Sequence, residues 1–196
     1  MKDNPTVIRS KKALTQAFFE LLAERPQKRI PVKQLCERAD YTRTTFYAHY
    51  EVIEDIPYQH YAEQWLAEFS DHYDTQIDPI EDPDQAAVHV TEWVFSYWRE
   101  QVDVVNSLKA IDMEFVIVQL FQDCANLAWE KMSNWNGSAL SPKLKEIITN
   151  QTANLMFMIF DLWVEEGFSR EAREMAEIFL SLTPTAPMEK LSVCFG

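Results

Sequence analysis

Apolar and polar residues alternate with a helical period along most of the chain. From Leu14 to Leu22 apolar residues recur every three or four positions, and Pro26 closes the pattern. This spacing places the apolar side chains on one helix face, which predicts a helix over about residues 6–24. Two shorter helices are predicted after it, at about 31–39 and 43–49, the second capped by the Thr42 hydroxyl.

The helical pattern lengthens after residue 50. Apolar residues from Ile53 to Tyr73 repeat about every four positions and predict one long helix, which Pro57 is expected to bend because it lacks a backbone N–H. Gly167 suits the left-handed residue that ends a helix, and Ser169 suits the cap of the next one. Further helices are predicted at about 84–100, 102–109, 112–134, 142–166 and 169–182, with a linker at 78–84, a loop at 134–141 and an irregular tail at 184–196.

No segment shows the strict alternation of a β-strand, so the sequence predicts an all-α fold of about nine helices. Hydrophobic residues make up 47% and charged residues 25% of the 196 residues, a balance that supports a packed core. The longest wholly apolar run, Leu155–Phe160, is far shorter than the roughly 20 residues of a membrane-spanning helix. We therefore expect a cytoplasmic protein with no membrane partner.

The glycine and cysteine content argues against several kinds of site. With only three glycines, the chain has no Gly-rich loop to hold a nucleotide phosphate. Cys36, Cys124 and Cys194 are widely spaced without a CxxC pair, which fits a reduced protein better than a disulfide framework or a zinc site. Cys36 falls on the apolar face of its predicted helix, which favours a buried hydrophobic residue over a redox sensor. We expect no metal and no cofactor.

Charge is divided unevenly along the chain. The net charge of −13 at pH 7, taken alone, argues against a nucleic-acid partner. Residues 1–50, however, contain ten Lys and Arg and five Asp and Glu, a net of +5, which leaves eight basic and 26 acidic residues, a net of −18, in the remainder. This split favours an N-terminal part that faces an anion, with a solvated basic face as the alternative.

The clearest functional pattern lies between residues 32 and 49. A short helix, a three-residue break at 40–42 and a second short helix are typical of a helix-turn-helix. Its recognition helix needs short hydrogen-bonding side chains and an Arg that reach base edges in the major groove, flanked by groups that contact phosphates. The residues expected to contact DNA are Lys33, Thr42, Arg43, Thr44, Thr45, Tyr47 and His49.

Residues 30–56, IPVKQLCERADYTRTTFYAHYEVIEDI, resemble the TetR family of transcriptional regulators. VKQLCERA is similar to the family's second helix, TRTTFYAHY to its recognition helix and EDI to the start of its fourth. The resemblance implies a DNA-binding domain over residues 1–50, then an effector-binding and dimerisation domain over 51–183 and the tail at 184–196. In such proteins the last two helices form a dimer, and a small effector bound in the larger domain releases the DNA.

The chain departs from the family pattern at four positions. Asp40 stands where the family usually has glycine, and Pro31 replaces the usual Ser or Thr cap. Glu51 and Ile53 occupy positions where the family often has lysines. Losing two cations and gaining a carboxylate reduces the number of phosphates neutralised, which predicts DNA binding weaker than is typical.

The segment from Leu144 to Trp163 is apolar nearly all round, which indicates burial on two sides. Two helices from each of two chains would pack as a four-helix bundle and hold the recognition helices about 34 Å apart, one turn of B-DNA. The alternative is a helix buried within a single chain. The residues expected at the dimer interface are Leu155, Ile159, Leu162, Trp163, Met175 and Phe179.

The middle of the chain is rich in aromatic residues, with polar residues scattered in mostly apolar helices. A pocket lined by aromatic rings and one or two carboxylates favours a cationic or polar aromatic effector. The alternative is an ordinary core with solvated carboxylates. The candidate effector-binding residues are Trp93, Trp98, Asp112, Phe115, Asp123, Asn126 and Trp129.

The chain has neither an HExxH nor a GxSxG pattern, so we expect no enzyme activity. The sequence favours a homodimeric transcriptional repressor that binds a pseudo-palindromic operator in double-stranded DNA and is released by a small-molecule effector. The alternative is a protein-interaction module or coactivator on the same fold, with weakened DNA binding. Glu51, Ile53 and the acidic remainder of the chain favour this alternative.

Overall fold

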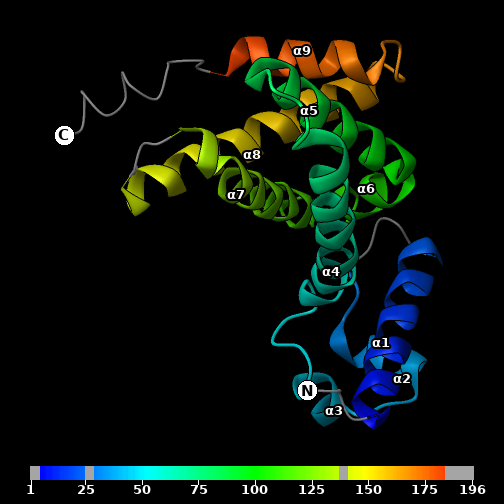
Figure 1. The fold of residues 1–196 in the computed structure, drawn as a ribbon. Helices are drawn as coiled ribbons and strands as arrows, with labels where there is room; N and C mark the ends of the chain where they lie inside the picture. Colours follow the sequence, from blue (N-terminus) through cyan, green and yellow to red (C-terminus); the bar gives the residue numbers. More distant parts are fainter. Residues whose placement is uncertain (1–4, 25–28, 137–140, 184–196) are drawn as a thin grey trace. The chain divides into compact units, whose positions relative to one another are not determined.

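The computed structural model describes residues 5–24, 29–136 and 141–183, and its regular elements in these ranges are all helical (Figure 1). The predicted all-α fold of about nine helices is therefore confirmed for this part of the chain. In chain order the elements are α1 (Pro5–Glu24), α2 (Val32–Ala39), α3 (Arg43–Tyr47), α4 (Asp55–His72), the π-helix η1 (Tyr73–Ile77), α5 (Pro83–Glu100), α6 (Val102–Lys109), α7 (Phe115–Asn136), α8 (Pro142–Glu165) and α9 (Ala172–Leu182).

The chain forms two compact units. The first comprises Met1–Gln64 and Asp103–Ile117, and the second comprises Trp65–Val102 and Val118–Gly196. The first unit thus extends beyond residue 50, the boundary expected for the DNA-binding part, through the first half of α4. The expected tail at 184–196, which includes Cys194, and the middle of the expected loop at 134–141 lie outside the described residues.

In the first unit, each of the first three helices buries one face. α1 packs against α2, and α2 packs against α3. Burying a Leu or Phe side chain contributes roughly 1.5–3 kcal/mol of stability, so these short helices are held by packing more than by their own propensity. The buried residues are Leu14, Ala17, Phe18, Leu21 and Leu22 on α1, Leu35 and Cys36 on α2, and Phe46 on α3.

In the second unit, α5 and α8 both pack against α9. The ring of Phe95 on α5 connects them, since its centroid lies 6.2 Å from that of Phe160, 6.1 Å from Trp163 and 6.3 Å from Phe179. All four side chains are buried. The apolar face of α8 predicted from the sequence is thus filled in part by neighbours within the same chain.

Pro57 does not interrupt a helical hydrogen bond. α4 begins at Asp55, so Pro57 lies in its first turn, where a backbone N–H has no acceptor within the helix. The reason for expecting a bend at Pro57 therefore does not hold. At the other end, the predicted long helix changes into the π-helix η1 at Tyr73, which the sequence pattern did not predict.

The turn between α8 and α9 is only partly as predicted. Gly167 adopts the expected left-handed conformation, with φ 65°, and Phe168 follows it with φ 56°. The prediction that Ser169 caps α9 is wrong, because α9 begins at Ala172. The indole N–H of Trp163 donates a hydrogen bond to the Arg170 carbonyl at 3.1 Å, which holds the chain in the turn beyond Ser169.

Candidate nucleic-acid interface

The chain turns sharply between α2 and α3 at Asp40. This residue adopts the left-handed conformation, with φ 57° and ψ 42°, and the N–H of Tyr41 donates to the carbonyl of Cys36 at 3.0 Å. A residue with a Cβ pays a conformational cost there, which Asp tolerates better than most. The sharp turn between α2 and α3 is therefore made with an aspartate in the left-handed conformation.

Thr42 caps α3 as predicted. Its Oγ1 accepts a hydrogen bond from the Thr45 N–H at 3.2 Å, and the two threonine Oγ1 atoms lie 3.0 Å apart. Both hydroxyls are thus engaged in the start of the helix, while the side chain of Thr44 is exposed. The cap fixes the direction in which α3 leaves the turn.

Phe46 anchors α3 in the first unit. Its side chain is fully buried, and its ring centroid lies 5.7 Å from that of Tyr50, which is also buried. The N–H groups of His49 and Tyr50 both donate to the Phe46 carbonyl at 2.9 Å, so a tight turn closes the helix. One face of this short helix is therefore fixed to the core, which leaves the opposite face to solvent.

The outer face of α3 carries Arg43, Thr44 and Tyr47, all exposed. Tyr47 is 61% exposed although its ring packs edge-on against that of Phe46, with the centroids 5.1 Å apart. Within the described part of the chain, no carboxylate pairs with the Arg43 guanidinium. The structure thus brings together a free cation, a hydroxyl and a phenol on one exposed surface.

His49 connects the chain just after α3 to α1. Its Nε2 lies 2.6 Å from the Oγ of Ser10, a residue that is only 3% exposed. Burial, together with the nearby positive charge of Lys11, lowers the pKa of His49. This nitrogen, expected at a phosphate, faces Ser10 instead. The sequence analysis missed Ser10, although a polar residue four positions before Leu14 on an apolar face was a usable signal.

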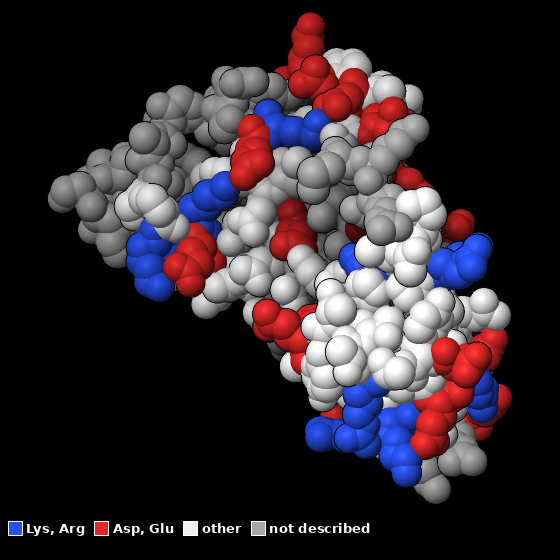
Figure 2. Space-filling model, turned by 90° about the horizontal axis from the view of Figure 1, so that it is seen from below, with Lys and Arg blue, Asp and Glu red and all other residues white. Residues whose placement is uncertain are grey.

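Other cations of the first unit differ in how far they are neutralised. Arg38 contacts both carboxylate oxygens of Glu24 at 2.8 Å. Lys33, whose side chain is 69% exposed, lies 3.7 Å from Glu37 in a surface pair that contributes little stability. In Figure 2 several Lys and Arg side chains lie together at the lower edge of the view beside Asp and Glu, and others are scattered elsewhere on the surface.

The segment before α4 lacks the cations that the family pattern would supply. Glu51 is exposed and Ile53 is half-buried. The Oδ2 of Asp55 accepts hydrogen bonds from the N–H groups of Glu51 at 2.8 Å and Val52 at 3.0 Å, which fixes the backbone there. The side chain of Glu51 therefore adds a negative charge to this surface.

The seven candidate effector residues do not fall in one compact unit. Asp112 and Phe115 belong to the first unit and are exposed, and Asp112 lies 3.9 Å from Arg29 in a surface ion pair. In the second unit, Trp93 stacks on His72 with ring centroids 5.0 Å apart, and Trp98 is fully buried. The half-buried candidates are Trp93, Asp123, Asn126 and Trp129.

Two aromatic residues that the candidate set omitted are distinctive. The indole nitrogen of Trp65 and the hydroxyl of Tyr73 are buried and have no hydrogen-bond partner among the described residues. Leaving a buried polar group unsatisfied costs about 1–3 kcal/mol. Burial, with the charges of Asp78 and Asp74, also raises the pKa of Tyr73. Their four-residue spacing with Phe69 was visible in the sequence, but their lack of partners was not.

Of the expected dimer residues, four are buried within the chain and two reach its surface. Leu162 is 45% exposed and Leu155 is half-buried, whereas the buried ones are Ile159, Trp163, Met175 and Phe179. A separate outer face of α8 exposes Ile147 and Met158 together with Leu162, spaced to fall on one side of the helix. The pairing of two chains through this region stays a prediction.

Among the described residues, no three His, Cys, Asp or Glu side chains gather as a metal site would require. Within the same ranges, no helix combines the length and the apolar character needed to cross a bilayer. Comparisons of the chain with protein-family models, with curated proteins and with solved structures found no significant match.

Proposed function

We propose that this protein is a TetR-like transcriptional regulator that binds DNA through α3. The observation that carries the proposal is the division of α3 into two faces: Phe46 is fully buried, whereas Arg43 and Tyr47 are exposed. A helix anchored in this way can enter the major groove without losing its own support. α3 thus presents a cation without a carboxylate partner, among the described residues, next to hydrogen-bonding side chains on one exposed face.

The chemistry of this surface suits a duplex. The Arg43 guanidinium, which has no carboxylate partner within the described residues, is able to form two hydrogen bonds to the O6 and N7 atoms of guanine. The hydroxyls of Thr44 and Tyr47 are suited to phosphate oxygens, which position the helix without reading sequence. The net charge of +5 over residues 1–50 supplies the nonspecific attraction.

The proposed regulator acts as a homodimer. The exposed apolar side chains of Ile147, Met158 and Leu162 on one side of α8 support this, since burying them between two chains would favour association. A two-fold dimer presents two recognition helices to a pseudo-palindromic operator. The buried polar atoms of Trp65 and Tyr73, unpartnered among the described residues, support a polar aromatic effector bound in the second unit. Effector binding then releases the DNA, so the protein is a repressor.

A DNA titration tests the proposal. Fragments of the upstream intergenic DNA of the gene are titrated at two salt concentrations with the parent protein and with Arg43→Ala and Tyr47→Ala. We expect one fragment to bind specifically, and Arg43→Ala to weaken that binding by about 1–3 kcal/mol. Lys143→Ala is the matched control, because Lys143 is an exposed cation on α8 whose side chain is 76% exposed; it should bind as the parent does.

A second function, a protein-interaction module with weakened DNA binding, is favoured by a specific observation. Glu51 is exposed next to the recognition segment, and Ile53 supplies no cation there. The net charge of −18 beyond residue 50 also repels phosphates. The same titration separates the two functions: if no fragment binds better than unrelated DNA, or if Arg43→Ala and Tyr47→Ala have no effect, the second function stands.

A further inference from the structure

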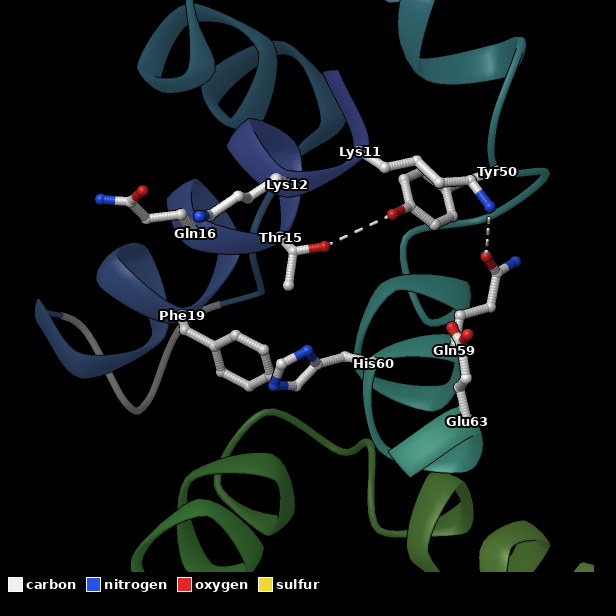
Figure 3. A pocket seen from close by; sticks show the side chains of 9 residues that line it. All are labelled: Lys11, Lys12, Thr15, Gln16, Phe19, Tyr50, Gln59, His60 and Glu63. Atoms are coloured by element: carbon white, nitrogen blue, oxygen red, sulfur yellow. Dashed lines mark hydrogen bonds between the residues drawn. The ribbon is translucent and has the colours of Figure 1, made fainter. Parts of the chain in front are cut away.

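The first unit contains a pocket of about 520 Å³ between α1 and the first half of α4. This volume falls within the range of small-molecule sites, which are roughly 300–1,000 Å³. Figure 3 shows the pocket with Phe19 and His60 at one end and Lys11 and Tyr50 at the other. The remaining lining residues are Lys12, Thr15, Gln16, Gln59 and Glu63.

Lys11 is the cation at one end of the pocket. Its side chain is half-buried, but no carboxylate in the described part of the chain forms an ion pair with it. Its Nζ lies 3.4 Å from the Oε1 of Gln59, a neutral amide, and 6.0 Å from the ring centroid of Tyr50. A half-buried ammonium is stabilised by an opposite charge, which the pocket is open to receive.

Phe19 and His60 form an apolar end for a planar group. Their ring centroids lie 5.0 Å apart with an interplanar angle of 55°, and the Tyr61 ring packs edge-on against both. The two rings are thus held in place where they line the pocket. Thr15, on the wall between the two ends, lies with its Oγ1 3.4 Å from the Tyr50 hydroxyl. The pocket thus combines one cationic end with one aromatic end.

The charges that line the pocket favour an anion over a cation. Lys11 and Lys12 contribute two positive charges, against the single carboxylate of Glu63. We propose that this pocket binds a small aromatic carboxylate, with the carboxylate on the Lys11 ammonium and the ring against Phe19 and His60. None of the lining residues belongs to the candidate effector set, and ligand binding in this pocket does not depend on the proposed DNA contact.

Calorimetric titration with three probes of equal shape tests the proposal: 2-naphthoate, 2-naphthamide and 2-naphthylmethylammonium. We expect 2-naphthoate to bind most tightly, and Lys11→Met, which keeps the apolar stem, to weaken it by about tenfold, the loss expected for a hydrogen bond to a charged group. Lys11→Arg should restore binding, and Glu63→Gln should tighten it by removing a repulsive charge. Lys143→Met is the control and should leave the affinity unchanged.

The location of the bound probe is checked by the backbone amide chemical shifts of 15N-labelled protein. We expect shifts to concentrate at residues 11–19 and 59–63. Equal affinity for the amide and the carboxylate, tighter binding of the ammonium, an unchanged affinity in Lys11→Met, or shifts confined to other residues would each overturn the proposal. Arg43→Ala should bind 2-naphthoate like the parent, so a failure of the DNA proposal and a failure of this one remain distinguishable.

Discussion

The Nε2 atom of His49 and the Oγ atom of Ser10 lie 2.6 Å apart, and this contact holds the chain just after α3 against α1. The two residues are 39 positions apart in the sequence. Ser10 also lies 3.0 Å from the carbonyl of Thr6. The Ser10 hydroxyl is the donor to the Thr6 carbonyl, whereas the direction of its hydrogen bond with His49 depends on the tautomer of the ring.

Ser10→Ala should destabilise the fold by about 1–2 kcal/mol, because it leaves a half-buried imidazole nitrogen without its partner. The free energy of unfolding is measured by urea denaturation. Ser107→Ala is the control, since the Ser107 hydroxyl donates only to the Asp103 carbonyl one turn earlier. Equal losses for the two variants would contradict a specific role for the contact.

Stability should fall as the pH is lowered from 7.5 to 6.0. Burial and Lys11 lower the pKa of His49, and burial also lowers the pKa values of His60 and His72. In the unfolded chain a histidine titrates near pKa 6.5, so near and below that pH the unfolded chain binds more protons than the folded one and becomes favoured. Urea midpoints at several pH values measure the slope.

The variant His49→Gln tests the contribution of that residue to the slope. It should flatten the dependence of the midpoint on pH without abolishing it, since two other histidines shift in the same direction. A slope identical to that of the parent would show that His49 titrates alike in both states.

Phe46→Ala should lower the stability of the protein, whereas Tyr47→Ala should lower its affinity for DNA, although the two residues are adjacent. Phe46 is fully buried, so its truncation opens a cavity and costs about 3–5 kcal/mol of stability. Tyr47 is 61% exposed, and its loss should leave stability within about 0.5 kcal/mol of the parent. Thermal denaturation and operator titration together separate the two: only Tyr47→Ala should bind DNA weakly while fully folded.

Asp40→Gly should stabilise the protein by about 0.5–1 kcal/mol. The residue has φ 57°, a conformation that glycine adopts without steric cost. Asp40→Val should have the opposite sign, because a β-branched side chain is disfavoured there. Chemical denaturation of both variants measures the difference; a glycine variant less stable than the parent would argue that the Asp40 side chain supports the turn.

Met158→Glu should convert the proposed dimer into monomers. Met158 is 66% exposed on α8, so the substitution should not disturb the core of one chain. A charge placed in an apolar interface is costly to bury unpaired. Sedimentation velocity at several protein concentrations measures the oligomeric state. Ile8→Glu is the control, because Ile8 is a 54% exposed residue of α1. A parent that is monomeric at every concentration would contradict the dimer.

Much of the local structure was predictable because it depends on neighbours in the sequence. The period of apolar residues in α1, the Thr42 cap and the left-handed Gly167 all depend on contacts within a few positions. The prediction that Ser169 caps α9 failed because the start of that helix depends on a contact from further away in the sequence. Trp163 bonds the Arg170 backbone and delays the start of α9, a contact that the local pattern does not encode.

The candidate sites were less predictable than the helices, because each site depends on which helix faces pack against one another in the folded chain. The sequence pattern predicted an exposed helix face around Arg43, and Arg43 and Tyr47 are both exposed. It did not identify Lys11 or Ser10, whose partners Gln59 and His49 lie 48 and 39 positions away. The sequence also did not show that Trp163 and Phe179 would be buried by residues of their own chain, such as Phe95.

The uneven charge of the chain has a consequence for how the molecule meets a polyanion. In the proposed function, a duplex attracts residues 1–50, with a net charge of +5, and repels the acidic remainder, with a net charge of −18. At physiological salt this acts within a screening distance of about 8 Å. The attraction to DNA therefore comes from residues 1–50, and it should weaken steeply as the salt concentration rises.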